Sequence, residues 1–393
     1  MAARLSPSGW LSGPAFDLGL MIGPTLLACA VAAALPDAVG LSAVGWLLLV
    51  VFIDVGHVWA TGLRLWTDRS PGHLRRALLL PLAVAIALIS VQLVVPHWYW
   101  RGMALLAVFH FLRQQVGIAM VYRHAAGLPP GPDARWERAA HWAAAGVPML
   151  YWLSHLPRRF VWFVEGDLPQ GLPTLAFYFG AAAGAVAWLG HGRNRWRSRS
   201  WSWGRDLWLL AGALAWWTGV VWRDDDLAFS LTNIVAHGVP YVALVVLVES
   251  RRTARGGASA LPPALWRGPG LALVLLALLT LAFTEEALWD RFVWQEHAAI
   301  FGQSDLWRLI FDGVSGLFNP EPRWASEEDG AWTPADRAVG LAVALLSVPQ
   351  VTHYLLDGLI WRSRADPTLA ALLRPAAPQK TAPAPPIGEA GPA

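Results

Sequence analysis

Long apolar stretches separated by short polar loops recur along this chain of 393 residues. A helix needs about 20 predominantly apolar residues to cross the hydrocarbon core of a bilayer, and most of these stretches have about that length. The pattern therefore predicts an all-α, polytopic integral membrane protein with about ten transmembrane helices. The predicted segments are residues 15–35, 41–63, 77–96, 101–122, 137–155, 172–190, 205–222, 227–249, 268–285 and 336–361.

The composition supports a membrane protein and argues against other classes. The chain is 55% hydrophobic and only 15% charged, whereas soluble domains carry about 25% charged residues. Its 25 tryptophans suit the membrane interface. The basic residues are almost all arginines in short loops, which is typical of topology signals and not of a nucleic-acid groove, so we expect no nucleic-acid partner. The single cysteine, Cys29, excludes an internal disulfide and a multi-cysteine metal site.

The same pattern predicts the domain organisation and the orientation. Residues 1–372 are expected to form one integral membrane domain, and the Pro- and Ala-rich residues 373–393 a disordered tail. Arginines gather in the loops after the second, fourth, sixth, eighth and tenth segments. The positive-inside rule therefore predicts a multi-pass protein of the cell inner membrane with both termini in the cytoplasm.

Ionisable and amide side chains interrupt four of the apolar segments. An ionisable group at membrane depth is costly unless it faces a partner, a cavity or a metal. All four histidines involved lie on even-numbered segments, which run in one direction, and at similar depth. We therefore predict that they converge on one site. The interruptions are FIDVGHVW with Asp54 and His57, VFHFLRQQVG with His110, Arg113 and Gln114, LTNIVAHGVPY with Asn233 and His237, and VTHYLLDGLIWR with His353 and Asp357.

Each of these histidines has a carboxylate or an amide three or four residues away, as is typical of metal ligands oriented by a neighbouring group. Three or four imidazoles with a carboxylate and an open position suit non-haem iron, with zinc or copper as alternatives. Asp357 is expected to bind the metal or to orient a ligand, and Arg113 with Gln114 to orient the oxidant or the substrate. His141 is an additional candidate ligand. The predicted metal ligands are His57, His110, His237 and His353.

Arg113 is the other costly group, because inserting a guanidinium at mid-span costs roughly 2.5–3.5 kcal/mol. Asp54 and Asp357 are the acids expected to balance it. A buried ion pair with one of them would fix the helix register. Alternatively, Arg113 would anchor a substrate carboxylate or an anionic oxygen species. Tyr241 and Tyr354 are expected to donate hydrogen bonds to the histidines, and Glu285, at a segment end, to be solvated.

The motifs DVGHVW, VFHFLRQQ and NIVAHGVPY resemble those of the bacterial Brp/Blh carotenoid-cleaving membrane dioxygenases. That resemblance implies a multi-span, iron-dependent enzyme, with His57, His110, His237 and His353 as iron ligands and a lipid-like, oxidisable substrate. The chain departs from the carotenoid enzymes in carrying Arg113 and Asp357 in the motif segments. The ending HYLLDGLIWR also resembles that of uncharacterised bacterial multi-span proteins.

The function expected from these patterns is that of a membrane-embedded, metal-dependent oxidoreductase of the oxygenase type. Its substrate would be a membrane lipid or another apolar small molecule. An ion- or proton-coupled transporter with an Asp54, Arg113 and Asp357 relay is the main alternative. Two further alternatives are polar side chains that only hold helices together and a haem held by two facing histidines. The tight HxxHH clusters of membrane desaturases are absent from the sequence.

Overall fold

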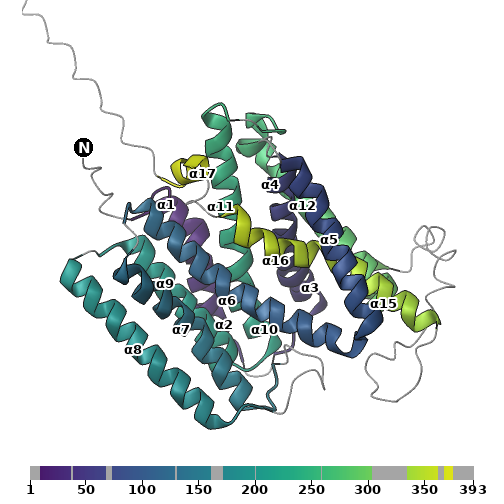
Figure 1. The fold of residues 1–393 in the computed structure, drawn as a ribbon, viewed down its shortest axis with the longest axis horizontal. Coiled ribbons are helices and arrows are strands. Elements are labelled where there is room, and N and C mark those ends of the chain that lie inside the picture. Colours follow the sequence, from purple (N-terminus) through teal and green to yellow (C-terminus); the bar gives the residue numbers. More distant parts are fainter. Residues whose placement is uncertain are drawn as a thin grey trace, which may run out of the picture.

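The computed structural model describes residues 9–36, 39–67, 73–128, 131–160, 171–199, 201–257, 259–302, 334–361 and 367–374. Within these ranges the regular elements are helices, and all ten predicted segments fall on them (Figure 1). The all-α class is therefore confirmed. The predicted tail lies outside the described residues from residue 375 onward.

Among the described residues, seven stretches are long and apolar enough to cross a membrane. Their bounds are Pro14–Ala34, Ala43–Thr67, Ala77–Val94, Pro96–Ala125, Asp226–Ala254, Gly268–Trp294 and Arg337–Ile360. Their main helices are α2 (Gly23–Ala34), α4 (Gly56–Thr67), α5 (His73–Val94), α6 (Tyr99–Ala125), α11 (Val235–Ala254), α12 (Gly268–Trp289), and the successive α15 (Pro334–Leu346) and α16 (Val348–Ile360).

The other three predicted segments form α7 (Pro132–Ser154), α8 (Thr174–Ser198) and α9 (Trp203–Trp216). These helices pack side by side at one edge of the molecule (Figure 1). They are not among the seven, and charged residues lie near the ends of two of them, for example Arg195 in the last turn of α8 and Asp206 in the first turn of α9. The count of about ten transmembrane helices stays a prediction.

A buried ion cluster fastens this edge to the rest of the protein. Glu137 of α7 accepts hydrogen bonds from Arg123 of α6 at 2.8 Å and from Arg205 of α9 at 2.9 and 2.7 Å. All three side chains are buried. A buried carboxylate is tolerable only when it is paired in this way, so Glu137 fixes the relative positions of three helices.

Helix α11 is the centre of the fold. In its most apolar stretch 78% of the residues are buried inside the protein, against 56% or less in the other six spans. Helices α4 and α6 contact it, and α16 contacts both α4 and α6. In contrast, α5 and α12 present exposed leucines such as Leu82 and Leu276, as expected of lipid-facing helices. The four histidine-bearing helices therefore pack together around α11, with their histidines in the interior.

Two of these four helices begin with π-helical turns. The π segment η2 (Leu47–Val55) runs directly into α4, and η5 (Ser230–Ile234) runs directly into α11. A π-helical turn is wider than an α-helical turn, so it changes which direction the following side chains face, and it is frequent at functional sites. His57 follows the end of η2 by two residues, and His237 follows the end of η5 by three.

Candidate metal centre

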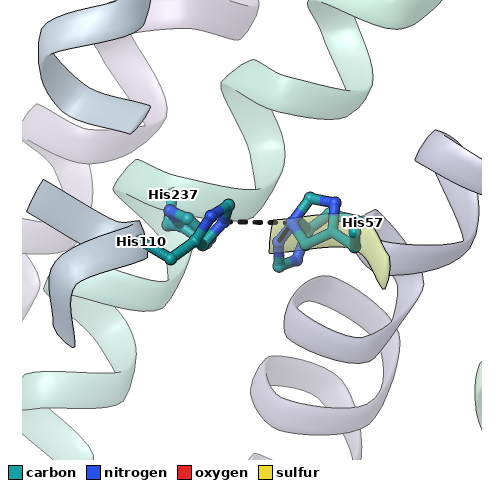
Figure 2. A group of neighbouring side chains, drawn as sticks. His57, His110 and His237 are labelled. Carbon is teal, nitrogen blue, oxygen red and sulfur yellow. Dashed lines mark hydrogen bonds between the residues drawn. The ribbon is translucent and has the colours of Figure 1, made fainter. Parts of the chain in front are cut away.

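Four imidazoles from four different helices meet in the interior. His57 lies on α4, His110 on α6, His237 on α11 and His353 on α16, and each is at most 4% exposed. One ring nitrogen of each lies within 4.8 Å of those of the other three. Figure 2 shows His57, His110 and His237 reaching toward a common region from separate helices. The predicted convergence of the four histidines is confirmed.

One nitrogen of His353 lies close to the same nitrogen of two other imidazoles. The Nε2 atom of His353 lies 3.1 Å from Nε2 of His57 and 3.0 Å from Nε2 of His110. Ligand nitrogens about 2.0–2.1 Å from one metal ion stand about 2.9–3.4 Å apart, for angles between 90° and tetrahedral. Both distances from His353 lie in this range, and the ligand atoms of all four histidines lie within 4.8 Å of one another, as a site for one metal ion requires after small side-chain shifts.

A chain of hydrogen bonds determines which nitrogen of His353 carries the proton. Its Nδ1 lies 2.6 Å from the hydroxyl of Thr61, and that hydroxyl lies 2.5 Å from the hydroxyl of Tyr241. Tyr241 in turn donates to Oδ1 of Asp357 at 2.5 Å. Since the tyrosine proton points at the carboxylate, Thr61 must donate to Tyr241 and accept from Nδ1–H of His353. The Nε2 lone pair of His353 is then free to face the other histidines, as metal binding requires.

Aromatic contacts hold the rings of His237 and His110 in place. His237 stacks on Phe111 with ring centroids 3.8 Å apart and planes at 7°, and His110 stacks on Tyr354 at 4.3 Å. Nε2 of His237 is buried without a hydrogen-bond partner. A buried nitrogen of this kind normally finds a partner, so its orphan state fits a fourth ligand position.

The predicted catalytic residues lie around this group. Asp357 stands 3.7 Å from Nδ1 of His353 and 3.9 Å from Nε2 of His110, so it lies beside the imidazoles but reaches His353 through Thr61 and Tyr241. Gln114 is buried and donates from Nε2 to the main-chain carbonyl of His237 at 2.7 Å. This bond ties α6 to α11 between two of the histidines.

Arg113 differs from the expectation. It makes no ion pair with Asp54 or with Asp357, all three of which are described residues. Its side chain is exposed and lines a cavity of about 390 Å³ together with His110 and Asp357. A cationic group that reaches an open cavity keeps contact with polar surroundings and does not need an internal counter-charge. The predicted register-fixing ion pair is therefore wrong.

Several neighbours take other roles than expected. Asn233 donates to the carbonyl of Ala215 at 3.3 Å and not to His237, because it lies within the π segment η5 and faces α9. Tyr241 bonds to Thr61 and Asp357 and not to a histidine, and Tyr354 stacks on His110.

Two acids, one on η2 and one on α12, also lie in surroundings that the sequence did not indicate. Asp54 places Oδ1 3.6 Å from Nδ1 of His57, and both atoms are buried without a hydrogen-bond partner. Glu285, which was expected to be solvated, is 6% exposed and accepts a hydrogen bond from the Trp59 indole at 2.7 Å. It is buried because α12 packs against α4 there. His141 is buried on α7 beside Glu137 and is not a member of the four-histidine group.

Sequence reasoning missed two residues of the site, Thr61 and Phe111. The threonine lies four residues after His57, so its place on the same helix face was the available signal. Phe111 carries no comparable signal, since its contact is with the ring of His237 on another helix.

A second, smaller cavity of about 150 Å³ reaches the site from another direction. Its walls come from α4, α5 and α16 and are mainly apolar, with Leu65, Pro81 and Leu356 among them, and it ends at His353. The histidine group is therefore approached by one cavity with charged walls and by one with apolar walls.

No family model, curated protein or solved structure matches this chain.

Proposed function

We propose that this chain is a membrane-embedded, metal-dependent oxidoreductase of the oxygenase type. The observation that carries the proposal is the group of four buried imidazoles on four helices with ligand atoms within 4.8 Å of one another. The ligands are His57, His110, His237 and His353, and the metal is a transition metal, iron before zinc or copper. Imidazole suits all three metals, and the carboxylate of Asp357 nearby favours iron.

When bound, the metal ion supplies the dioxygen binding and one-electron chemistry that side chains alone lack. The chain supplies the surroundings. Its helices bury the four rings, which limits contact between water and reduced oxygen. The chain from His353 through Thr61 and Tyr241 to Asp357 holds a proton on Nδ1 and keeps Nε2 as a ligand. Gln114 fixes α11 relative to α6.

The substrate class follows from the surroundings of the site. Apolar walls in the smaller cavity suit a hydrocarbon chain, so we propose a membrane lipid or another apolar small molecule as substrate. The motif resemblance to Brp/Blh dioxygenases points to the same reaction class. If both atoms of dioxygen enter the substrate, the reaction balances with dioxygen as the only co-reactant. We also propose that the protein lies in the inner membrane with both termini cytoplasmic, as its arginine-rich loops suggest.

The first test is metal content. Protein purified without chelators should contain about one transition-metal ion per chain by mass spectrometry. His353→Ala should lose it, because this imidazole contacts two others. His191→Ala is the matched control, since this buried histidine lies on α8, outside the group.

The second test is turnover. The protein is incubated with bacterial lipid extract under ¹⁸O₂, and label in the extracted lipids is measured by mass spectrometry. Label should appear with wild type and His191→Ala and not with His353→Ala. Metal-free wild-type protein that carries protons or ions into liposomes would contradict the proposal and favour the transporter.

A further inference from the structure

We propose that the larger cavity binds the anionic head of the substrate, which makes the substrate an amphiphile carrying a carboxylate or a phosphate. The anion site follows from the residues of the cavity, and only the identification of its ligand as the substrate rests on the proposed function. The cavity, of about 390 Å³, lies within the size range of small-molecule sites.

Two guanidinium groups line this cavity without an ion pair or a hydrogen bond to the described residues. Arg113 comes from α6 and Arg138 from α7, and within the described part of the chain neither makes an ion pair or a hydrogen bond. Other arginines in the interior are paired, as Arg123 and Arg205 are with Glu137. Guanidinium groups bind carboxylate and phosphate through paired N–H donors. Two unpaired ones facing a common cavity therefore favour an anionic ligand.

The cavity wall carries one acid, Asp357, for its two arginines. Asp357 accepts a hydrogen bond from Tyr241 and lies beside His110 and His353. With two cations and one carboxylate, the cavity wall keeps a formal charge of +1 when Asp357 is ionised. An anion bound at the arginines therefore meets a net positive wall.

The rest of the lining suits an alkyl chain. Ile118, Val121 and Leu244 line the same cavity as the arginines, and so does His110, which belongs to the imidazole group. An amphiphile held at its head by Arg113 and Arg138 would thus extend apolar carbons toward the proposed metal centre. The arginines would select the substrate class and decide which carbon reaches the site.

A substitution at Gly358 of α16 offers a second way to displace the Arg113 side chain. A Cβ atom at this position would lie 2.7 Å from Nη1 and 2.9 Å from Cζ of Arg113, and closer still to Nη2. The guanidinium thus packs against the α16 backbone where only glycine leaves room. Because it is the end of a flexible side chain, Gly358→Ala should move Arg113 without unfolding the helix.

The experiment measures binding of radiolabelled dodecanoate and of dodecyl phosphate to the full chain in phosphatidylcholine nanodiscs. Dodecanol and dodecyltrimethylammonium have the same chain with a neutral and a cationic head. The two anionic probes should bind at least tenfold more tightly than the other two. Arg113→Gln, Arg138→Gln and Gly358→Ala should each weaken dodecanoate at least tenfold. Arg135→Gln, an exposed arginine of α7 outside the cavity, should leave binding unchanged.

Phosphatidic acid added to the nanodiscs separates the two sources of the anion. If it displaces dodecanoate, the ligand is a lipid headgroup, and if it does not, the ligand is a free single-chain acid. Equal binding of dodecanol and dodecanoate, or unchanged binding in Arg113→Gln and Arg138→Gln, would overturn the inference. Metal content is measured on the same samples, so loss of the metal proposal and loss of the anion site are seen separately.

Discussion

Replacing Thr61 with valine tests whether the hydrogen-bond chain prepares His353 for metal binding. The change removes one buried hydroxyl at nearly constant volume. That hydroxyl connects Nδ1 of His353, at 2.6 Å, with the hydroxyl of Tyr241, at 2.5 Å. Without it, Nδ1–H of the metal-bound form has no acceptor. In the metal-free form the proton can move to Nε2 and bond to another imidazole, so the penalty falls mainly on the metal-bound state.

The magnitude follows from two estimates. A buried donor without a partner costs about 1–3 kcal/mol. Loss of a group that orients a ligand typically lowers metal affinity about 10–100-fold, or roughly 1.4–2.8 kcal/mol at 1.4 kcal/mol per factor of ten. We therefore expect Thr61→Val to bind the metal 10–100-fold more weakly while keeping the fold.

The assay is competition of the purified protein against a chelator of known affinity. Thr67→Val is the control, because Thr67 is buried on the same helix and its hydroxyl donates to the nearby carbonyl of Arg64, away from the histidines. Asp357→Asn should lose affinity as well, and the double variant with Thr61→Val should lose less than the sum, since both act through one chain. Wild-type affinity in Thr61→Val, or full additivity in the double variant, would refute the role of this chain.

Three further predictions concern the stability of the protein and its orientation in the membrane. Glu137→Gln should destabilise the protein by about 3–5 kcal/mol, because it leaves Arg123 and Arg205 buried without their carboxylate. Thermal melting measures this loss, with Asp133→Asn, at an exposed position, as the control. An unchanged melting temperature of Glu137→Gln would contradict the pairing. Gly238→Ala should cost about 1–3 kcal/mol, because its Cβ would lie 2.7 Å from the carbonyl oxygen of Ile53; Gly102→Ala, which meets nothing within 4 Å, should melt like wild type. A C-terminal fusion should be fluorescent with green fluorescent protein and inactive with alkaline phosphatase; the reverse would place the C-terminus outside the cytoplasm.

The helical class and the four histidines could be predicted because both depend on one-dimensional patterns. Apolar length determines where a helix can cross a bilayer. A histidine at membrane depth needs a partner, so several at similar depth point to one another. These two rules were sufficient for His57, His110, His237 and His353, although the four lie on helices far apart in sequence.

The surroundings of the histidines could not be predicted in the same way. The π turns of η2 and η5 change the facing of residues such as Asn233, and an α-helical spacing rule does not foresee them. Ring contacts between helices, such as Phe111 with His237, depend on packing that periodicity does not encode. The rule that an ionisable group at membrane depth needs a partner also misjudged Arg113. That rule assumes a closed interior, whereas Arg113 lines a cavity.

The most direct test of a shared metal site is X-ray absorption at the edge of the metal found in the purified protein. The four-histidine centre predicts three or four nitrogen or oxygen neighbours at about 2.0–2.2 Å, together with the outer-shell scattering of imidazole rings, and loss of that scattering in His353→Ala. A spectrum of wild-type protein without imidazole scattering, or one that His353→Ala leaves unchanged, would contradict the account.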